Sequence, residues 1–155
     1  AQIDRFGNIN ATIIGGDYQQ PKVRLPGSGG SQEIAGWANR CYIMTPHQKR
    51  RFPEKVDFIT SAGFLGGRAE REATRARGGG PLVVVTNLGL LEPDESGELI
   101  LSALHPGCTY EQVKENTGWP VRAANEVRVT DTPLESELKL LREELDPGGI
   151  YLKGS

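Results

Sequence analysis

The chain has 155 residues, which is enough for one domain with a single hydrophobic core. Its 18 Lys and Arg residues nearly balance its 20 Asp and Glu residues, so the overall charge favours neither nucleic acid nor an anionic membrane as a partner. No apolar run approaches the roughly 20 residues that span a bilayer, and the first residues lack the pattern of a secretory signal. We therefore expect a soluble, cytoplasmic protein. Cys41 and Cys108 lack metal-ligand spacing, so reduced, buried thiols are expected.

Residues 3–14 are expected to form two β-rich runs joined by a glycine turn. Asp4, Asn8 and Asn10 lie in this region. Asn and Asp commonly form turns because their side chains bond to nearby backbone groups. The same side chains can instead line a binding site, and the pattern alone leaves both roles open.

A glycine-rich turn follows, between a short expected strand and a helix. Gly27, Gly29 and Gly30 leave backbone N–H groups unshielded by side chains. Such a turn can hold an anion, or a carbonyl oxygen that becomes negative during acyl transfer. The simpler interpretation is a tight connection in which Ser31 caps the helix. A Rossmann cofactor site is disfavoured, because Gln32 occupies the third glycine position of the dinucleotide fingerprint.

The flanking elements of this turn are a strand at 22–25 and a helix at 32–40, with Ile34 and Trp37 facing the core. Strand, glycine loop and helix together form the basic α/β unit. Residues 41–44 are expected as the next short strand.

Two further strands are expected at 56–60 and 81–87, and the continuous apolar run of the second predicts a central strand. Residues 68–80 are arginine-rich and end in glycines, which indicates a mobile surface loop or a helical excursion. These arginines either face solvent or contact the phosphates of a large anionic ligand. The basic triplet at 49–51 leaves the same two alternatives open.

The C-terminal part begins with residues 99–104, the expected hairpin partner of the 81–87 strand. His105 lies at the end of that strand. The sequence leaves open whether it is a structural residue or a catalytic acid or base. Thr109 and Gln112 form a capping box for a short helix, and residues 121–129 form an extended segment.

The last expected helix is capped by Thr132, with Pro133 in its first turn and Glu135 completing the box. One face of this helix carries a leucine stripe that is core or partner surface. The stripe consists of Leu134, Leu138, Leu141 and Leu145.

Taken together, the chain resembles the second (B) subunit of class I coenzyme A transferases, especially that of glutaconate CoA-transferase. The matching segments are residues 2–10, 21–30, 56–60, 86–89, 104–107 and the final helix with its 145–147 end. The resemblance implies an α/β fold with a mostly parallel sheet flanked by helices, of the kind shared by CoA transferases and sugar-phosphate isomerases. It also implies that residues 1–155 are a single domain, the C-terminal part of a longer subunit.

For function, the resemblance implies transfer of CoA from an acyl-CoA to a carboxylic acid through a glutamyl thioester. Coenzyme A is then a substrate, with no permanently bound cofactor and no metal. The expected partners are an A-type subunit, the preceding N-terminal segment of the B-type subunit, acyl-CoA and a carboxylic acid, and neither nucleic acid nor membrane. The site residues implied are the backbone of Gly27, Gly29 and Gly30 as oxyanion hole, with Asn8, Asn10, Ser28 and Ser31 binding substrate or CoA.

The sequence departs from the family pattern in one respect. The nucleophilic glutamate of the transferases lies upstream of the stretch that matches residues 1–10, and nothing in this chain corresponds to it. Either an N-terminal region is lost, cleaved or placed elsewhere, or another chain supplies the nucleophile. Two alternatives follow: a subunit of a CoA-thioester ring-opening hydrolase of steroid degradation, and a non-catalytic CoA-binding or assembly subunit.

Overall fold

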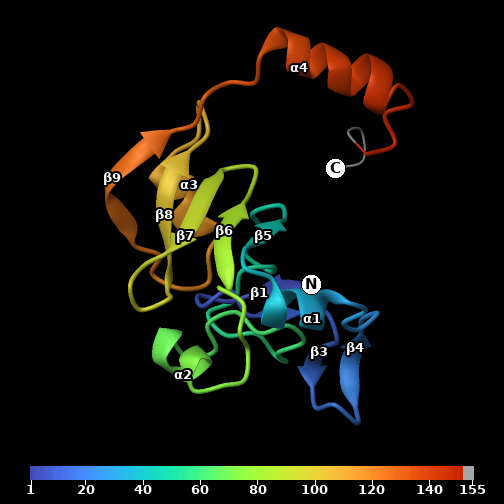
Figure 1. The fold of residues 1–155 in the computed structure, drawn as a ribbon, viewed down its shortest axis with the longest axis vertical. Coiled ribbons are helices and arrows are strands. Elements are labelled where there is room, and N and C mark those ends of the chain that lie inside the picture. The colour runs from blue at the N-terminus through green and yellow to red at the C-terminus, as the bar shows by residue number, and fades with distance from the viewer. Residues whose placement is uncertain (152–155) are drawn as a thin grey trace.

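The structure is a computed structural model that describes residues 1–151. Its largest element is a sheet of five strands in the order β5-β6-β7-β8-β9 (Figure 1). The strands are β5 (Cys41–Met44), β6 (Pro81–Val85), β7 (Gly89–Pro93), β8 (Leu99–Leu104) and β9 (Ala123–Val129). β5 pairs parallel with β6, and β8 pairs parallel with β9. The two central pairings, β6 with β7 and β7 with β8, are antiparallel.

The α/β class is confirmed, and the sheet is mixed where a mostly parallel one was expected. The reason lies in the connections, because parallel neighbours need a long crossover and a few residues suffice for an antiparallel turn. Only residues 86–88 separate β6 from β7, and only residues 94–98 separate β7 from β8. The hairpin partner expected for the 81–87 strand was therefore wrong: β8 pairs with β7, not with β6.

Two small hairpins precede the sheet. β1 (Gln2–Ile3) pairs antiparallel with β2 (Ile9–Asn10), and β3 (Ile13–Gly16) pairs antiparallel with β4 (Pro21–Arg24). The strand before the glycine loop thus belongs to a hairpin outside the main sheet, and the expected α/β unit at this point is wrong.

No strand forms at 56–60, contrary to expectation. Ser61 makes an isolated bridge with Ile9, and the backbone N–H groups of Thr60 and Ser61 both donate to the Ile9 carbonyl. Residues 56–60 therefore pack against the first hairpin and do not pair as a strand in a sheet. The partner is far away in the sequence, so the alternating pattern of the segment cannot specify it.

The helices are short. They are α1 (Ser31–Trp37), α2 (Arg68–Glu72), α3 (Tyr110–Glu115), α4 (Glu135–Lys139) and the π-helix η1 (Leu140–Leu145). The capping box at Thr109 is confirmed, since its side chain accepts from the Gln112 N–H and the Gln112 side chain accepts from the Thr109 N–H.

Three expectations about helices were wrong. Gly30, not Ser31, is the N-cap residue of α1, and no side chain caps it. Ile34 and Trp37 were expected to face the core, but they are 58% and 62% exposed. The helix α1 lies on the surface, and Ala35 is its buried residue. The last helix begins after Leu134, so Thr132 is not its cap.

The core lies between the five-stranded sheet, α3 and the chain around Phe52. Its members are Ile3, Phe52, Val84, Leu91, Leu99, Leu101, Val113, Trp119 and Val121. The segment formed by α4 and η1 stands away from this body (Figure 1). Its Leu134 and Leu145 are largely exposed, so the leucine stripe is not part of the core. Cys41 and Cys108 are free thiols, as expected, but both are partly exposed. No helix within residues 1–151 combines the length and apolarity needed to cross a membrane.

Candidate active site

The glycine loop at 27–30 continues the β3–β4 hairpin and leads directly into α1. The Leu25 N–H donates to the Thr12 carbonyl at 2.9 Å, and the Gly27 N–H donates to the Ala11 carbonyl at 2.7 Å. The entrance of the loop is therefore held by backbone pairing. Because the Gly27 N–H is bonded inside the chain, it is not available as an oxyanion-hole donor.

The next three amides are available. Within residues 1–151, the N–H groups of Ser28, Gly29 and Gly30 have no hydrogen-bond partner. The φ angles of Gly27 and Gly29 are 95° and 50°, which favour glycine. A Cβ atom built on Gly27, Gly29 or Gly30 meets nothing within 4 Å, so the loop borders open space. The loop N–H groups that are available to a ligand are thus those of Ser28, Gly29 and Gly30.

Two serine hydroxyls fix the shape of the turn. The Ser31 Oγ donates to the Ser28 carbonyl at 2.7 Å and lies 2.8 Å from the Ser61 Oγ. A hydroxyl has one proton to donate, so the Ser61 hydroxyl is the donor in the second bond. Ser61 is itself 1% exposed. Ser31 therefore stabilises the turn through its hydroxyl group. The sequence pattern did not reveal Ser61, because it lies 30 residues from Ser31.

A cavity of about 460 Å³ lies in front of the loop. Its wall contains Gly27, Ser28, Thr12 and Thr60, and the hydroxyls of the two threonines lie 2.7 Å apart. The remaining lining residues are Tyr18, Gln32, Phe58, Ile59 and Ala62. None of these described lining residues is acidic, so a carboxylate nucleophile would have to enter this cavity from elsewhere.

Asn8 is 1% exposed, and it lines a different cavity of about 620 Å³ and not the one in front of the glycine loop. Its amide nitrogen donates to Asp4 and to the Leu65 carbonyl, while its oxygen accepts from the N–H groups of Gly63 and Leu65. Burial raises the pKa of the Asp4 carboxyl, although Asn8 and the Phe6 N–H donate to it. The Asn8 amide is thus fully used in joining the first hairpin to residues 63–65.

Asn10 is fully buried, at 0% exposure. Its nitrogen donates to the Gln2 side chain and the Ile13 carbonyl, and its oxygen accepts from the Thr12 and Ile13 N–H groups. The structure therefore gives Asn8 and Asn10 supporting positions, with no polar atom directed into the cavity. Neither is carried forward as a substrate contact.

Arg71 is one of the arginines within residues 68–80 that were expected either to face solvent or to contact phosphates. It was expected within a mobile loop or helical excursion, and it is instead 4% exposed. Its guanidinium donates to the carbonyls of Ala35, Ala62, Gly63 and Gly78. It therefore ties α1 to the segment after Ser61 and to the loop after α2.

Neither histidine lines this cavity. His105 bonds to the Thr130 hydroxyl and the Thr86 carbonyl, each at 2.8 Å, which matches a structural role. His47 is buried against Phe52, with ring centroids 4.3 Å apart, and burial lowers its pKa to about 4. In the part of the chain that the structure describes, no group of three or more His, Cys, Asp or Glu side chains could hold a metal ion.

A family model, described as coenzyme A transferase, matches residues 1–116. The chain belongs to this family. It is 50% identical over 143 residues to the B-type subunit of 3-oxoadipate CoA-transferase from Pseudomonas knackmussii, covering 92% of this chain and 55% of that protein. It is 43% identical over 155 residues to the B-type subunit of glutaconate CoA-transferase from Acidaminococcus fermentans, covering 99% of this chain and 57% of that protein.

A crystal structure of glutaconate coenzyme A-transferase from Acidaminococcus fermentans has the same fold, with a TM-score of 0.88 and 40% identity over 100% of this chain and 59% of that one. The cholesterol ring-cleaving hydrolase IpdB subunit of Rhodococcus jostii is 34% identical over 152 residues, covering 96% of this chain and 58% of that protein. The chain spans a little over half the length of the curated relatives that it matches.

Proposed function

We propose that this chain is part of the B-type subunit of a heteromeric CoA-transferase, which moves CoA from an acyl-CoA to a carboxylic acid. The observation that carries the proposal is the run of three unpaired amides at Ser28, Gly29 and Gly30, of which Ser28 also lines an open cavity. Backbone N–H groups aimed at a developing oxyanion lower the barrier of acyl transfer. The 50% and 43% identities to B-type subunits of two CoA-transferases support the same activity.

In the proposed reaction, a glutamate from outside this chain attacks the thioester carbonyl, and the C–S bond breaks to give an acyl-glutamyl anhydride and CoA thiolate. The thiolate then attacks the glutamyl carbonyl, which releases the first carboxylate and leaves a glutamyl-CoA thioester. The acceptor carboxylate takes CoA by the reverse of these steps. In each addition the carbonyl oxygen becomes negative, and the Ser28, Gly29 and Gly30 amides stabilise it.

The proposed partners are an A-type subunit and the remainder of a B-type subunit, because the relatives named above are longer than this chain and are subunits of larger enzymes. The cavity wall contributed by this chain lacks a carboxylate, so we place the nucleophile on one of these partners. Coenzyme A is proposed as a substrate in place of a bound cofactor.

The test compares Gly30→Pro with Gly30→Ala in the subunit that contains this chain, assembled with its A-type partner. The φ of Gly30 is −88°, within about 10° of the range that proline adopts, and Gly30→Pro removes the N–H. Gly30→Ala keeps the N–H, and its Cβ meets nothing within 4 Å. We expect kcat to fall about 100-fold for Gly30→Pro and to stay near wild type for Gly30→Ala.

The assay follows labelled acid exchanging into acyl-CoA, starting with 3-oxoadipate and glutaconate, the acids in the names of the two relatives. Equal rates for the two variants would overturn the role of the Gly30 amide. Release of free CoA by water, without an acceptor acid, would instead identify a hydrolase like the IpdB relative. CoA binding with neither reaction would identify a binding or assembly subunit.

A further inference from the structure

Three cavities that share lining residues lie along α1, between the glycine loop and the loop that follows α2, and we call them together the groove. Gln32 and Ala62 line both the glycine-loop cavity and a neighbouring cavity of about 430 Å³. Trp37 and Arg75 line both that second cavity and a third one of about 570 Å³. The three cavities are therefore neighbours, and the first of them is lined by Ser28, one of the residues with an unpaired amide.

The far end of this groove has a fixed shape. The Gly78 N–H donates to the Gly36 carbonyl at 2.9 Å, which joins the loop after α2 to α1. A Cβ on Gly78 would collide with the Ala38 carbonyl, and one on Gly79 would collide with the Asn39 carbonyl. The loop and the end of α1 are thus in direct backbone contact. This contact places the backbone of the loop beside the end of α1.

The chemistry of this end suits a nucleotide. Trp37 is 62% exposed and offers an indole face on which a base can stack. Arg75 and Arg77 are exposed and form no ion pair with any residue that the structure describes. Guanidinium groups bind phosphate through paired N–H donors. Glu33 and Glu72 also line these cavities, so the site carries both signs of charge.

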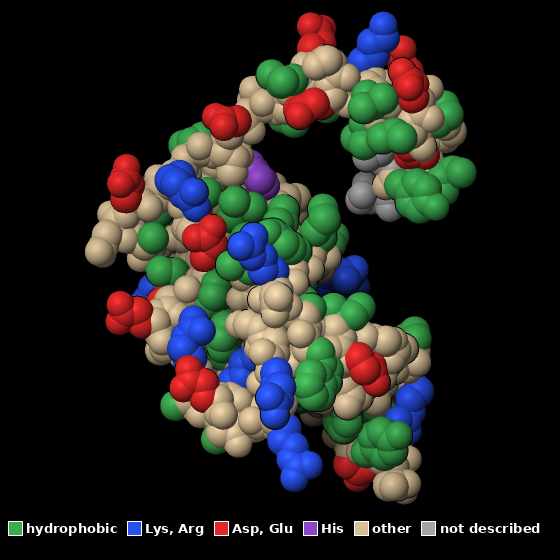
Figure 2. All heavy atoms as spheres, in the orientation of Figure 1, with side chains coloured by type: hydrophobic (Ala, Val, Ile, Leu, Met, Phe, Trp, Pro, Cys, Tyr) green, Lys and Arg blue, Asp and Glu red, His purple; other side chains and the backbone are tan. Residues whose placement is uncertain are grey.

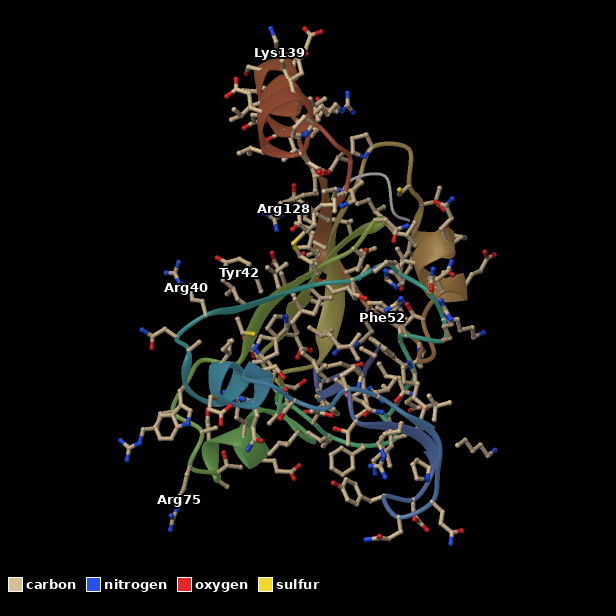
Figure 3. All side chains as sticks on the ribbon, turned by 90° about the vertical axis from the view of Figure 1, so that its right-hand side faces the viewer. Arg40, Tyr42, Phe52, Arg75, Arg128 and Lys139 are labelled. Carbon is tan, nitrogen blue, oxygen red and sulfur yellow. The ribbon has the colours of Figure 1, made fainter. Side chains whose placement is uncertain are left out.

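The figures agree with this arrangement. Figure 3 shows Arg75 projecting outward from the loop beside α2, on the side of the molecule to which Arg40 also projects. On the face drawn in Figure 2, Lys and Arg side chains lie next to apolar ones over the region of α1 and α2. The side chains of Trp37, Arg75 and Arg77 are all exposed to solvent.

We propose that Trp37, Arg75 and Arg77 bind the 3′-phosphorylated ADP end of coenzyme A, while its thioester reaches the Ser28–Gly30 amides. This inference rests on the proposed function. α1 has seven residues, so roughly 10 Å separates the glycine loop from Trp37 along the helix axis. The pantetheine arm occupies the groove past Gln32 and Ala62, the base stacks on the indole, and the phosphates pair with the two guanidinium groups.

The first experiment titrates the 155-residue chain with adenosine 3′,5′-bisphosphate and follows tryptophan fluorescence. Trp37 is exposed whereas Trp119 is 3% exposed, so quenching by a stacked adenine reports on Trp37. We expect saturable quenching in the wild type and its loss in Trp37→Phe. Calorimetry on both proteins measures the same affinities without relying on an indole signal.

The second experiment measures coenzyme A binding and transferase kinetics for Arg75→Gln, Arg77→Gln and the double variant. Each lost charge-assisted hydrogen bond weakens binding by about 10-fold. In the assembled enzyme, KM for acyl-CoA rises by the same factor and kcat stays unchanged, because a distant contact contributes equally in ground and transition states. The control is Arg142→Gln in η1, which removes the same charge away from the groove.

The outcomes separate the two proposals. Transferase activity with no bisphosphate binding, or with KM unchanged in the double variant, would overturn the nucleotide site and leave the transferase standing. Bisphosphate binding that depends on Trp37 and the two arginines, in a protein without transferase activity, would support the site and overturn the function. Weakened binding in Arg142→Gln to the same extent would show a general charge effect and would also overturn the site.

Discussion

Arg71 carries a guanidinium into the interior without a carboxylate partner among the described residues. Its donors instead end on backbone carbonyls of three separate segments, at Ala35, at Ala62 and Gly63, and at Gly78. A planar fork with five N–H donors can satisfy such a set, whereas an ammonium group has only three donors on a flexible stem. The arginine is thus specified by geometry as well as by charge.

We therefore predict that Arg71→Lys lowers the free energy of unfolding by about 2–4 kcal/mol, because several buried carbonyls lose a charged donor. The exposed Arg75→Lys, four residues along, is the matched control and changes it by less than about 0.5 kcal/mol. Urea unfolding at neutral pH measures both. Equal stability of the two variants would contradict the linking role that the structure assigns to Arg71.

His47 is a buried histidine whose hydrogen bonds and pKa affect how the stability of the fold depends on pH. Its Nε2 lies 3.0 Å from the Thr117 hydroxyl, and its Nδ1 lies 3.1 Å from the Thr86 hydroxyl. The Thr117 hydroxyl already donates to the Val113 carbonyl, so it accepts a proton from Nε2. The Thr86 hydroxyl likewise donates its one proton to the Gly89 carbonyl at 2.9 Å, so Nδ1 of neutral His47 receives no proton from it. Burial without a carboxylate partner explains why the pKa is lowered from 6.5 to about 4.

The lowered pKa of His47 predicts a pH dependence of stability. Between pH 6.5 and 4 the unfolded chain binds a proton at this residue and the folded chain does not. Acidification through this window therefore reduces the free energy of unfolding. We expect His47→Gln to flatten the dependence between pH 7 and 5 in urea unfolding. An unchanged slope in His47→Gln would exclude His47 as the cause.

At the scale of elements, the N-terminal ends of α3 and α4 differ: local sequence predicts the cap of the first helix correctly and that of the second wrongly. The Thr109 capping box is formed as its four-residue pattern predicts, since both bonds lie within one turn. The similar pattern at Thr132 is not used, because the helix begins at Glu135 and the Leu134 N–H bonds to the Glu137 side chain. A helix capped at Thr132 and one that begins at Glu135 differ too little in free energy for the local sequence to predict which one forms.

This difference gives a paired prediction. Thr109→Ala should lower the free energy of unfolding by about 1 kcal/mol, because the α3 N-terminus loses its side-chain acceptor. Thr132→Ala should change it by less than about 0.5 kcal/mol, since Thr132 caps nothing. Chemical unfolding of both variants provides the comparison. A larger effect at Thr132 than at Thr109 would contradict the helix start in the structure.

The α4–η1 segment is the other element with a testable property. It stands apart from the sheet in Figure 1, and its large side chains Leu134 and Leu145 are exposed. We predict that a chain ending at Asp131 unfolds at the same urea concentration as the 155-residue chain, because few buried apolar contacts are lost. A clear fall in the midpoint would mean that this segment packs on the core in solution.

For the whole molecule, the proposed assembly predicts linkage between binding and stability. A partner that binds only the folded chain stabilises it by mass action, by about 2.7 kcal/mol when its concentration is 100-fold above Kd. The melting temperature of the chain should therefore rise with the concentration of its A-type partner. An unrelated protein at equal concentration is the control, and a midpoint independent of the A-type partner would contradict direct assembly.

Much of the fold was predictable from the sequence, because the responsible interactions are local. The strands at 41–44 and 99–104 and the α3 capping box depend on apolar runs and on one turn of backbone. The glycine loop was also predictable, since open amides need only residues without side chains. The resemblance to CoA transferases rested on the glycine loop within residues 21–30 and on other segments, at 2–10, 56–60, 86–89, 104–107 and the final helix.

Only the tertiary structure decided how the segments meet. The pattern at 56–60 is that of a strand, yet Thr60 and the adjacent Ser61 bond to Ile9, far away in the chain. Equally, three glycines suggested three donors, but the Gly27 N–H is taken by Ala11 while the Ser28 amide is free. Local sequence specifies which backbone groups are unshielded, and the long-range hydrogen bonds determine which of them stay available to a substrate.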